Sequence, residues 1–233
     1  MSNSIRLRGM LDVLARRLMP GLCGVCGACA GDSQVCAPCA AELPRVGRGC
    51  PCCALPLPDE GVACGACQRL QPSFDATFAA LAYRFPVDRL VQALKYGERL
   101  SLAAHFAALL AELPRPSGPA VVVPMPLHPS RLRTRGFNQA AEIARPLARA
   151  WGLPLELDSV RRVRDTAPQA NLPWSRRRVN MRGAFQCDAA LDGMCVVVVD
   201  DVMTTGATLD ELARVLKAKG AVRVENRIVA RTL

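Results

Sequence analysis

The feature that most constrains the fold of this chain is a run of valines that ends in two aspartates and leads into a hydroxyl-rich turn. Residues 196–199 are four consecutive valines, a pattern typical of a strand buried on both faces of a parallel sheet. Asp200 and Asp201 end the predicted strand, a Thr/Gly/Thr turn occupies residues 204–208, and periodic apolar positions from Leu209 onward predict a helix. Open α/β sheets bind ligands at the carboxyl ends of their strands, so this order of elements predicts a binding site.

The residue types in this turn suit a phosphorylated sugar. A helix start offers unpaired backbone N–H groups and the positive end of the helix dipole, and both favour a phosphate. The hydroxyls of Thr204, Thr205 and Thr208 can add donors, while Gly206 lets the backbone approach an anion closely. The two carboxylates could accept hydrogen bonds from the vicinal hydroxyls of a ribose or help to hold Mg²⁺. An ordinary strand with an acidic helix cap would explain the two aspartates alone, but not the whole string.

The string resembles the phosphoribosyl pyrophosphate (PRPP) motif of type I phosphoribosyltransferases, and the rest of the chain resembles the ComF family within that fold. The further positions that carry the resemblance are residues 124–128, 135–139 and 164–166, Gln169, Arg178, Asn180, residues 184–185 and the paired cysteines near the start. The resemblance implies an α/β fold with a mainly parallel sheet flanked by helices and a small N-terminal zinc-ribbon module. It also implies PRPP bound with Mg²⁺, and a connection with DNA uptake or the use of external DNA.

The same resemblance implies roles for individual residues. The catalytic acids would be Asp200 and Asp201. The PRPP-binding set would be Asp200, Asp201, Thr204, Thr205, Gly206, Ala207 and Thr208. A pyrophosphate loop over residues 127–139 would contribute Arg135, Asn138 and Gln139, with Arg131 and Arg133 as further candidates, and a mobile hood over residues 161–182 would contribute Arg164 and Gln169. For each single arginine, a solvated surface position is the ordinary alternative.

No general base is expected from the turn. Purine-salvage members of the superfamily place an aspartate where this chain has Thr204, so the chemistry would depend on electrostatics. Mg²⁺ and arginines would stabilise the departing pyrophosphate while the two aspartates hold an electron-poor ribose. The acceptor cannot be read from the residues. Residues 95–97, Lys-Tyr-Gly, also match a family pattern, but the sequence supplies no role for them, and His128 is expected to be a loop residue.

Ten of the twelve cysteines fall between Cys23 and Cys67. Eight of them form C-x₂-C pairs: Cys23 with Cys26, Cys36 with Cys39, Cys50 with Cys53, and Cys64 with Cys67. Two such pairs can bind one structural Zn²⁺, so we expect two neighbouring zinc ribbons, with interleaved pairing and reactive thiol pairs as the alternatives. Cys52 could compete with Cys53, and Cys29 has no assigned role. The segment is poor in apolar residues and should therefore depend on metal to fold.

Composition changes near residue 70, which predicts two domains. Residues 1–70 would hold an amphipathic N-terminal helix and the double zinc ribbon, and residues 71–233 would form the phosphoribosyltransferase-like domain. Strands are expected over residues 74–83, 120–123 and 222–230, with an extended segment from residue 155. Helices are expected over residues 87–95, 102–113, 138–151 and 175–181.

Positive charge is concentrated in one part of the chain. The net charge is +10, and residues 131–182 hold twelve arginines, no lysine and four acids. An arginine-only segment favours the recognition of phosphate or pyrophosphate, and nucleic acid is the other candidate partner. Aromatic residues make up only 4% of the chain, so a row of base-stacking platforms is not expected.

The sequence leaves three functional readings. The first is a Mg²⁺-dependent phosphoribosyltransferase-type protein that binds PRPP. The second is a competence factor that binds single-stranded DNA and has a regulatory or vestigial PRPP site. The third is a zinc-organised adaptor for a DNA-translocating helicase. No apolar run approaches the ~18 residues of a membrane span, and the basic start lacks a secretory core, so we expect a cytoplasmic protein without membrane insertion.

Overall fold

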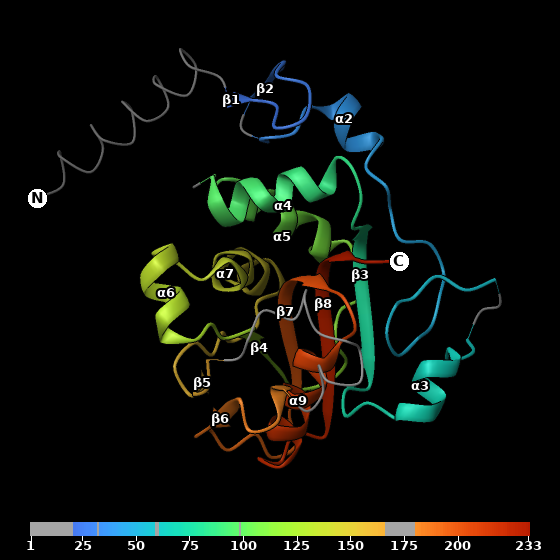
Figure 1. Cartoon of the computed structure of the whole chain (residues 1–233), viewed down its shortest axis with the longest axis vertical. Helices are drawn as coiled ribbons and strands as arrows, with labels where there is room; N and C mark the ends of the chain where they lie inside the picture. Colours follow the sequence, from blue (N-terminus) through green and yellow to red (C-terminus); the bar gives the residue numbers. More distant parts are fainter. Residues whose placement is uncertain (1–20, 32, 59–60, 98, 166–179) are drawn as a thin grey trace, which may run out of the picture.

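The computed structural model describes residues 21–31, 33–58, 61–97, 99–165 and 180–233. The predicted N-terminal helix, Gln169 and most of the helix expected over residues 175–181 lie outside the described residues. At the centre is a four-stranded sheet with the order β3-β8-β7-β4, in which every neighbouring pair is parallel (Figure 1). Its strands are β3 (Ala76–Ala82), β4 (Ala120–Pro124), β7 (Cys195–Met203) and β8 (Arg223–Arg231). The expected parallel α/β sheet is therefore confirmed.

The valine run lies in β7, between β4 and β8. Val196 and Val198 contribute to the core on one face of the sheet, and Val197 and Val199 contribute to the core on the other. Successive side chains of a strand point to opposite faces, so a strand covered on both sides is apolar at every position. Burial on both faces is the reason for the uninterrupted run.

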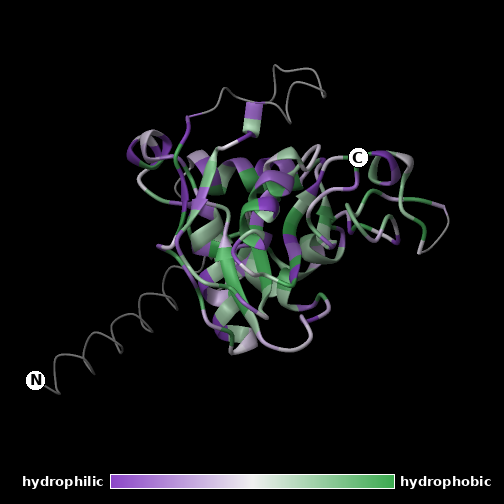
Figure 2. Cartoon of the chain, turned by 90° about the horizontal axis from the view of Figure 1, so that it is seen from below, coloured by the Kyte–Doolittle hydropathy of each residue, from purple (hydrophilic) through white to green (hydrophobic). Residues whose placement is uncertain are grey.

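Helices cover both faces. One face is covered by α4 (Val87–Tyr96), α5 (Leu102–Ala111) and α7 (Gln139–Trp151). The other face is covered by α9 (Ala207–Lys217) and by an antiparallel pair, β5 (Val160–Arg162) and β6 (Phe185–Cys187). Figure 2 shows the strands mostly in the hydrophobic colour, with the helices around them. Among the described residues, no helix is long and apolar enough to span a membrane.

The cysteine-rich segment packs against both layers. Its first part holds β1 (Gly21–Leu22), β2 (Cys29–Gly31) and α2 (Ala37–Ala41), and its second part ends in α3 (Gly65–Leu70). The first part lies beside α4 and the second lies beyond β3 (Figure 1). Side chains of the first part join the core on the α4 side, and side chains of the second join the core on the α9 side. The segment is thus attached to the sheet at two separate places.

Two sequence expectations differ from the structure. The segment over residues 127–139 is not a loop throughout, because it contains the helix α6 (Pro129–Arg135). The ring of His128 accepts a hydrogen bond from Ser130 N, proline stands at the first helical position, and Gly136 ends the helix with φ of 82°. The strand also does not end at Asp200 and Asp201, since its pairing with β8 continues to Met203. The acidic pair therefore lies within the paired part of β7, near its end, rather than after the strand.

Candidate functional site

Asp200 and Asp201 lie near the carboxyl end of β7, in different environments. Asp201 is only 3% exposed, and its Oδ2 atom lies 2.7 Å from Nζ of Lys95, at the end of α4. Asp200 is half-buried. Burial raises the pKa of Asp200 well above its ordinary value, and the neighbouring charge of Asp201 adds to the increase. Burial would lower the pKa of Lys95, but the charges of Asp201 and Asp200 raise it instead.

The hydroxyl-rich bend follows directly and leads into α9. Thr204 is exposed, whereas Thr205 and Thr208 are half-buried. Gly206 has φ of 81°, a backbone conformation that strains any residue with a Cβ atom, so glycine is favoured at this position. The Oγ1 atom of Thr205 lies 3.5 Å from the amide nitrogen of Ala207, the first residue of α9. The bend therefore presents hydroxyls at the start of a helix, as the sequence predicted.

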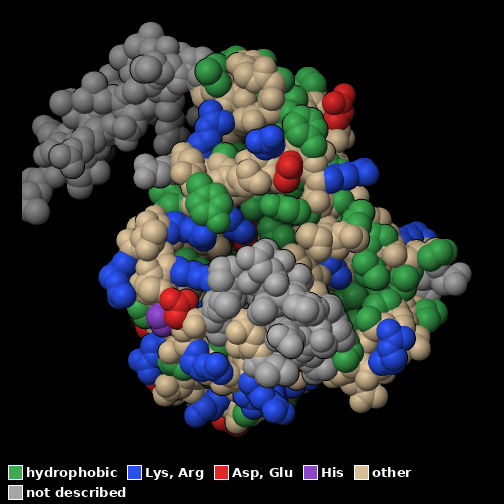
Figure 3. Space-filling model, in the orientation of Figure 1, with side chains coloured by type: hydrophobic (Ala, Val, Ile, Leu, Met, Phe, Trp, Pro, Cys, Tyr) green, Lys and Arg blue, Asp and Glu red, His purple; other side chains and the backbone are tan. Residues whose placement is uncertain are grey.

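A basic cleft of about 500 Å³ lies beside the acidic pair. Its lining residues are Lys95, Tyr96, Ser130, Arg131, Thr134, Arg135, Phe137 and Asp165. Figure 3 shows Lys and Arg side chains gathered between α4 and α6 on this face. The guanidinium of Arg135 lies 5.2 Å from the ring centroid of Tyr96 and donates to Oε1 of Gln139. Three cations, together with the hydroxyls of Ser130 and Thr134, can hold a polyanion in this cleft.

One acid moderates the charge of this cleft. The Oδ2 atom of Asp165 accepts a hydrogen bond of 2.7 Å from the hydroxyl of Ser130 and lies 3.7 Å from Nδ1 of His128, and the Oδ1 atom lies 3.9 Å from Nε of Arg131. The Ser130 hydroxyl and the nearby His128, Arg131 and Arg162 lower the pKa of Asp165, although slight burial opposes them. An anion that entered the cleft would exchange partners with this carboxylate.

The residues expected to bind pyrophosphate have different surroundings. Arg135 and Arg131 line the cleft, and Arg133 is exposed on α6.

The other three residues of this set already have hydrogen-bond partners within the protein. Asn138 caps α7 through a 3.0 Å hydrogen bond from Ala140 N and donates to the carbonyl oxygen of Met125 at 3.1 Å. Gln139 is buried and accepts from Arg135. Arg164 is exposed and donates to the carbonyl oxygen of Arg182. Direct ligand contacts by Asn138, Gln139 and Arg164 stay predictions.

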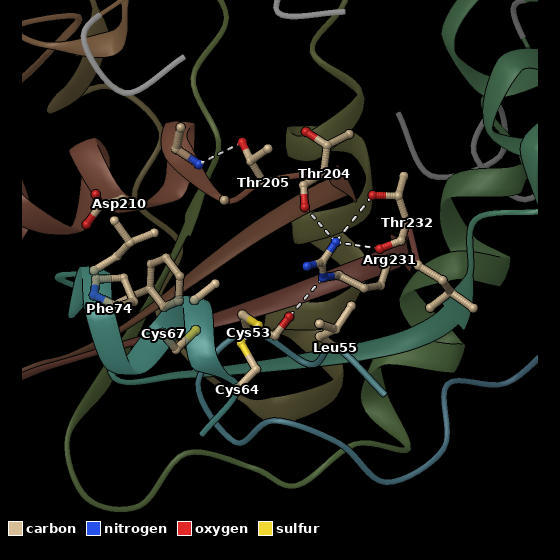
Figure 4. Close-up of a pocket in the computed structure, with 16 residues that line it drawn as sticks. Cys53, Leu55, Cys64, Cys67, Phe74, Thr204, Thr205, Asp210, Arg231 and Thr232 are labelled. Carbon is tan, nitrogen blue, oxygen red and sulfur yellow. Dashed lines mark hydrogen bonds between the residues drawn. The ribbon is translucent and has the colours of Figure 1, made fainter. Parts of the chain in front are cut away.

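Arg231, which no sequence pattern singles out, joins the bend to the cysteine-rich segment. Its side chain is buried at the end of β8, with Nε 2.9 Å from the carbonyl oxygen of Cys53. One terminal nitrogen donates to the carbonyl oxygen of Met203 at 3.2 Å. The same nitrogen donates to the carbonyl oxygen of Thr204 (Figure 4). A cavity of about 290 Å³, lined by residues of both segments, lies beside this junction. No local pattern could have revealed these contacts, because they join parts of the chain that are far apart.

The eight paired cysteines form two groups of four. The Sγ atoms of Cys23, Cys26, Cys36 and Cys39 (the first cysteine group) lie within 4.8 Å of one another, as do those of Cys50, Cys53, Cys64 and Cys67 (the second cysteine group). The Sγ atoms of Cys26 and Cys36, and those of Cys53 and Cys64, lie 3.7 Å apart. Two ligands of a tetrahedral zinc with Zn–S bonds of about 2.3 Å lie about 3.8 Å apart. Each group could therefore hold one zinc ion, and the grouping agrees with sequential rather than interleaved pairing.

Backbone amides point at the first sulfur of each group. The amide nitrogens of Val25 and Cys36 lie 3.4 Å from Sγ of Cys23, and that of Cys64 lies 3.3 Å from Sγ of Cys50. Burial would raise the pKa of both thiols, but backbone N–H donors lower that of Cys23 to about 6 and that of Cys50 to about 7. Cys52 stays outside the second group, and its thiol faces the carbonyl oxygen of Phe74 at 3.9 Å.

Comparison with known proteins agrees with this architecture. Residues 132–231 match the family model described as "Phosphoribosyl transferase domain". The "DNA utilization protein YhgH" of Salmonella typhi is 34% identical over 224 residues, which cover 92% of this chain and 99% of that protein. The "Competence protein F" of Haemophilus influenzae is 28% identical over 95% of this chain and 93% of that protein. The chain belongs to the ComF family.

A second ComF relative matches only part of the chain. The "Competence protein ComFC" of Bacillus subtilis is 34% identical over 105 residues, which cover 43% of this chain and 39% of that protein. Solved phosphoribosyltransferases are more distant. The hypoxanthine phosphoribosyltransferase of Trypanosoma cruzi is 16% identical, with a TM-score of 0.32, over 56% of this chain and 65% of that chain. The assignment to the ComF family depends on the full-length relatives, not on this structural likeness.

Replacing Cys64 by serine should remove one zinc ion per chain, whereas replacing Cys52 should remove none. Cys64 belongs to the second cysteine group, and Cys52, a neighbour in space, does not. Elemental analysis of the purified variants measures the zinc content directly. A loss of zinc from the Cys52→Ser variant would show that Cys52 is a ligand and that the grouping is wrong.

Replacing Arg231 by methionine should lower the free energy of unfolding by at least ~2 kcal/mol, because a buried carbonyl left without its donor costs about 1–3 kcal/mol and this change affects several. Urea unfolding measures the difference. Arg149→Met, at an exposed position of α7, is the matched control and should change the stability by less than ~0.5 kcal/mol. Equal stability of the two variants would mean that the Arg231 contacts do not hold the bend.

Proposed function

We propose that this chain binds PRPP with Mg²⁺ and is a phosphoribosyltransferase-type protein that serves DNA uptake or the use of external DNA. The observation that carries the proposal is the position of the hydroxyl-rich bend, between the acidic pair of β7 and the start of α9. The names of the relatives, "DNA utilization protein" and "Competence protein", support the cellular role. The cytoplasmic location and the two structural zinc ions belong to the same proposal.

The three parts of PRPP would each have a place. The 5′-phosphate would lie at the bend, where Thr204, Thr205 and Thr208 offer hydroxyls beside a helix start. The ribose hydroxyls would meet Asp200 and Asp201. The pyrophosphate would occupy the basic cleft with Arg131 and Arg135. The bend follows the acidic pair along the chain, and the ion pair of Asp201 with Lys95 joins the acidic pair to the cleft, which supports one ligand across all three.

The carboxylates also fit a divalent cation. Asp201 is paired with Lys95, whereas Asp200 is half-buried and has an oxygen ligand of the kind that Mg²⁺ prefers. When it is bound, Mg²⁺ would supply positive charge next to the pyrophosphate oxygens. Burial and the charge of Asp201 raise the pKa of Asp200, so the affinity for Mg²⁺ and PRPP should increase as pH rises through that pKa.

During transfer, the residues of this chain would act through charge and position. The bond between C1 and the pyrophosphate oxygen breaks, and its electron pair leaves with the pyrophosphate. The arginines of the cleft would stabilise that charge, and the carboxylates would stabilise the positive ribose. The acceptor is not assigned, and no residue of the bend serves as its base, since Thr204 stands at the candidate position.

Replacing Asp200 by asparagine should weaken PRPP binding at least ~tenfold in the presence of Mg²⁺, because a charge-assisted hydrogen bond contributes about 1.5–3 kcal/mol. Isothermal calorimetry measures the affinity, and thermal unfolding confirms that the variant is folded. Asp201→Asn should weaken binding as well, but it also leaves Lys95 without its partner. Asp158→Asn, at an exposed position, is the control. Unchanged affinity in the Asp200 variant would overturn the proposed site.

A second candidate function is the binding of single-stranded DNA at the rim of the basic cleft. The observation that favours it is Tyr96, which is 74% exposed and lies against the guanidinium of Arg135. An exposed aromatic ring among arginines is suited to stack on a base while the cations bind phosphates. This function is compatible with PRPP binding nearby.

Affinity for a single-stranded oligonucleotide should then fall about tenfold or more between ~50 and ~200 mM salt, because each neutralised phosphate releases counterions. Tyr96→Leu should weaken binding by about 1–3 kcal/mol. Phe85→Leu changes another exposed ring, at the other end of α4, and should have no effect. Fluorescence anisotropy measures both quantities. Absence of binding even at low salt would rule this candidate out.

A further inference from the structure

Lys95 borders both halves of the proposed PRPP site. It lies in the last turn of α4, and its side chain is 20% exposed. Its Nζ atom lies 2.7 Å from Oδ2 of Asp201, on the ribose side, and the same residue lines the basic cleft on the pyrophosphate side. Lys95 is thus both a lining residue of the cleft and the ion-pair partner of Asp201. A single side chain therefore lies where ribose and pyrophosphate would be joined.

The ammonium group has donors to spare. A lysine carries three N–H donors, and the ion pair with Asp201 brings its Nζ atom close to one carboxylate oxygen only. The carboxylate of Asp201 is almost fully buried, so it holds the lysine in place and keeps it charged. The other groups around the cleft are Arg131, Arg135, Ser130 and Thr134, with Asp165 as the one acid. The remaining donors are thus available to an anion that enters this cleft.

We propose that Lys95 contacts the substrate, with its ammonium on the pyrophosphate oxygen that is bonded to C1 of the ribose. This inference rests on the proposed function. When the C1–O bond breaks, the electron pair moves to that oxygen, and the acceptor supplies the pair that forms the new bond to C1. Lys95 stabilises the leaving oxygen through a charge-assisted hydrogen bond and keeps its proton. The role gives a function to the lysine of the Lys-Tyr-Gly pattern at residues 95–97.

A purely structural role makes a different prediction. If Lys95 only neutralised the buried Asp201, its loss would disturb the acidic pair and so the ribose half of the site. Ribose 5-phosphate, which carries the ribose and the 5′-phosphate but no pyrophosphate, would then lose the most affinity. If Lys95 contacts the leaving group, pyrophosphate and PRPP lose affinity, while ribose 5-phosphate is affected little.

The experiment compares three ligands on the full chain. Isothermal calorimetry with PRPP, pyrophosphate and ribose 5-phosphate, in the presence of Mg²⁺, is run on wild type and Lys95→Met. We expect at least ~tenfold weaker binding of PRPP and pyrophosphate, the loss of one charge-assisted hydrogen bond, and a change below ~threefold for ribose 5-phosphate. Lys95→Arg, which keeps the charge, should recover part of the pyrophosphate affinity.

A matched control is available elsewhere in the chain. Lys217 forms an ion pair of 2.9 Å with Asp75, and neither residue lines the basic cleft. Lys217→Met removes a Lys–Asp pair of the same kind and should leave the affinity for all three ligands unchanged. A similar loss in this variant would mean that the effect of Lys95→Met is general and would overturn the inference.

If Lys95→Met fails to fold, the comparison is made with Asp201→Asn as the background, because both members of the pair are then uncharged. Adding Lys95→Met to Asp201→Asn should still weaken pyrophosphate at least ~tenfold. If the wild type binds PRPP but the lysine variants bind pyrophosphate with unchanged affinity, the role of Lys95 is wrong and the proposed function stands. Wild type that binds none of the three ligands overturns both.

Discussion

The guanidinium of Arg231 is the contact on which the geometry of the site depends. It is buried at the end of the sheet and donates to the carbonyl oxygens of Cys53 and of Met203 and Thr204. A buried cation is tolerated only when its donors are satisfied, and carbonyl groups in a bend need donors just as strictly. Each side of this contact therefore requires the other. The conformation of the bend is set by a strand end and by the cysteine-rich segment, as well as by its own sequence.

The acidic pair imposes a second constraint. Two adjacent carboxylates near the end of a buried strand repel each other and lose hydration, which is why the pKa of Asp200 is raised. Lys95 offsets one of the two charges at 2.7 Å. In the proposed function, Mg²⁺ would offset the other. In the basic cleft the positive charges are in excess, because Asp165 is the single acid beside three cations among the lining residues. An incoming anion would replace Asp165 as the partner of Arg131.

The sequence was sufficient where the signal is local. The valine run, the bend and the spacing of the cysteine pairs each specify their structure within a few residues, and the parallel sheet and the two cysteine groups follow from them. The sequence did not predict α6, because this helix is too short to show a periodic pattern of apolar residues. It begins at the ring of His128 and a proline, which are weak signals on their own. Sequence patterns also assigned no role to Lys95 and did not select Arg231, because their partners lie more than 20 residues away along the chain. Asn138 is an intermediate case, since asparagine before a helix is a recognisable cap.

The two cysteine groups lie next to the two ends of the proposed site. The first packs on α4, where a Cβ atom at Gly24 would lie 2.9 Å from Cδ2 of Leu90. Lys95 follows Leu90 by five residues on the same helix. The second is joined to the bend through Cys53 and Arg231. A small segment that depends on metal to fold is rigid only when the metal is bound, and so are the contacts that it makes with the rest of the protein. The proposed zinc ions would therefore fix different parts of one ligand site, the first the pyrophosphate side and the second the 5′-phosphate side. This arrangement gives a physical reason for two zinc ribbons on one phosphoribosyltransferase-like fold.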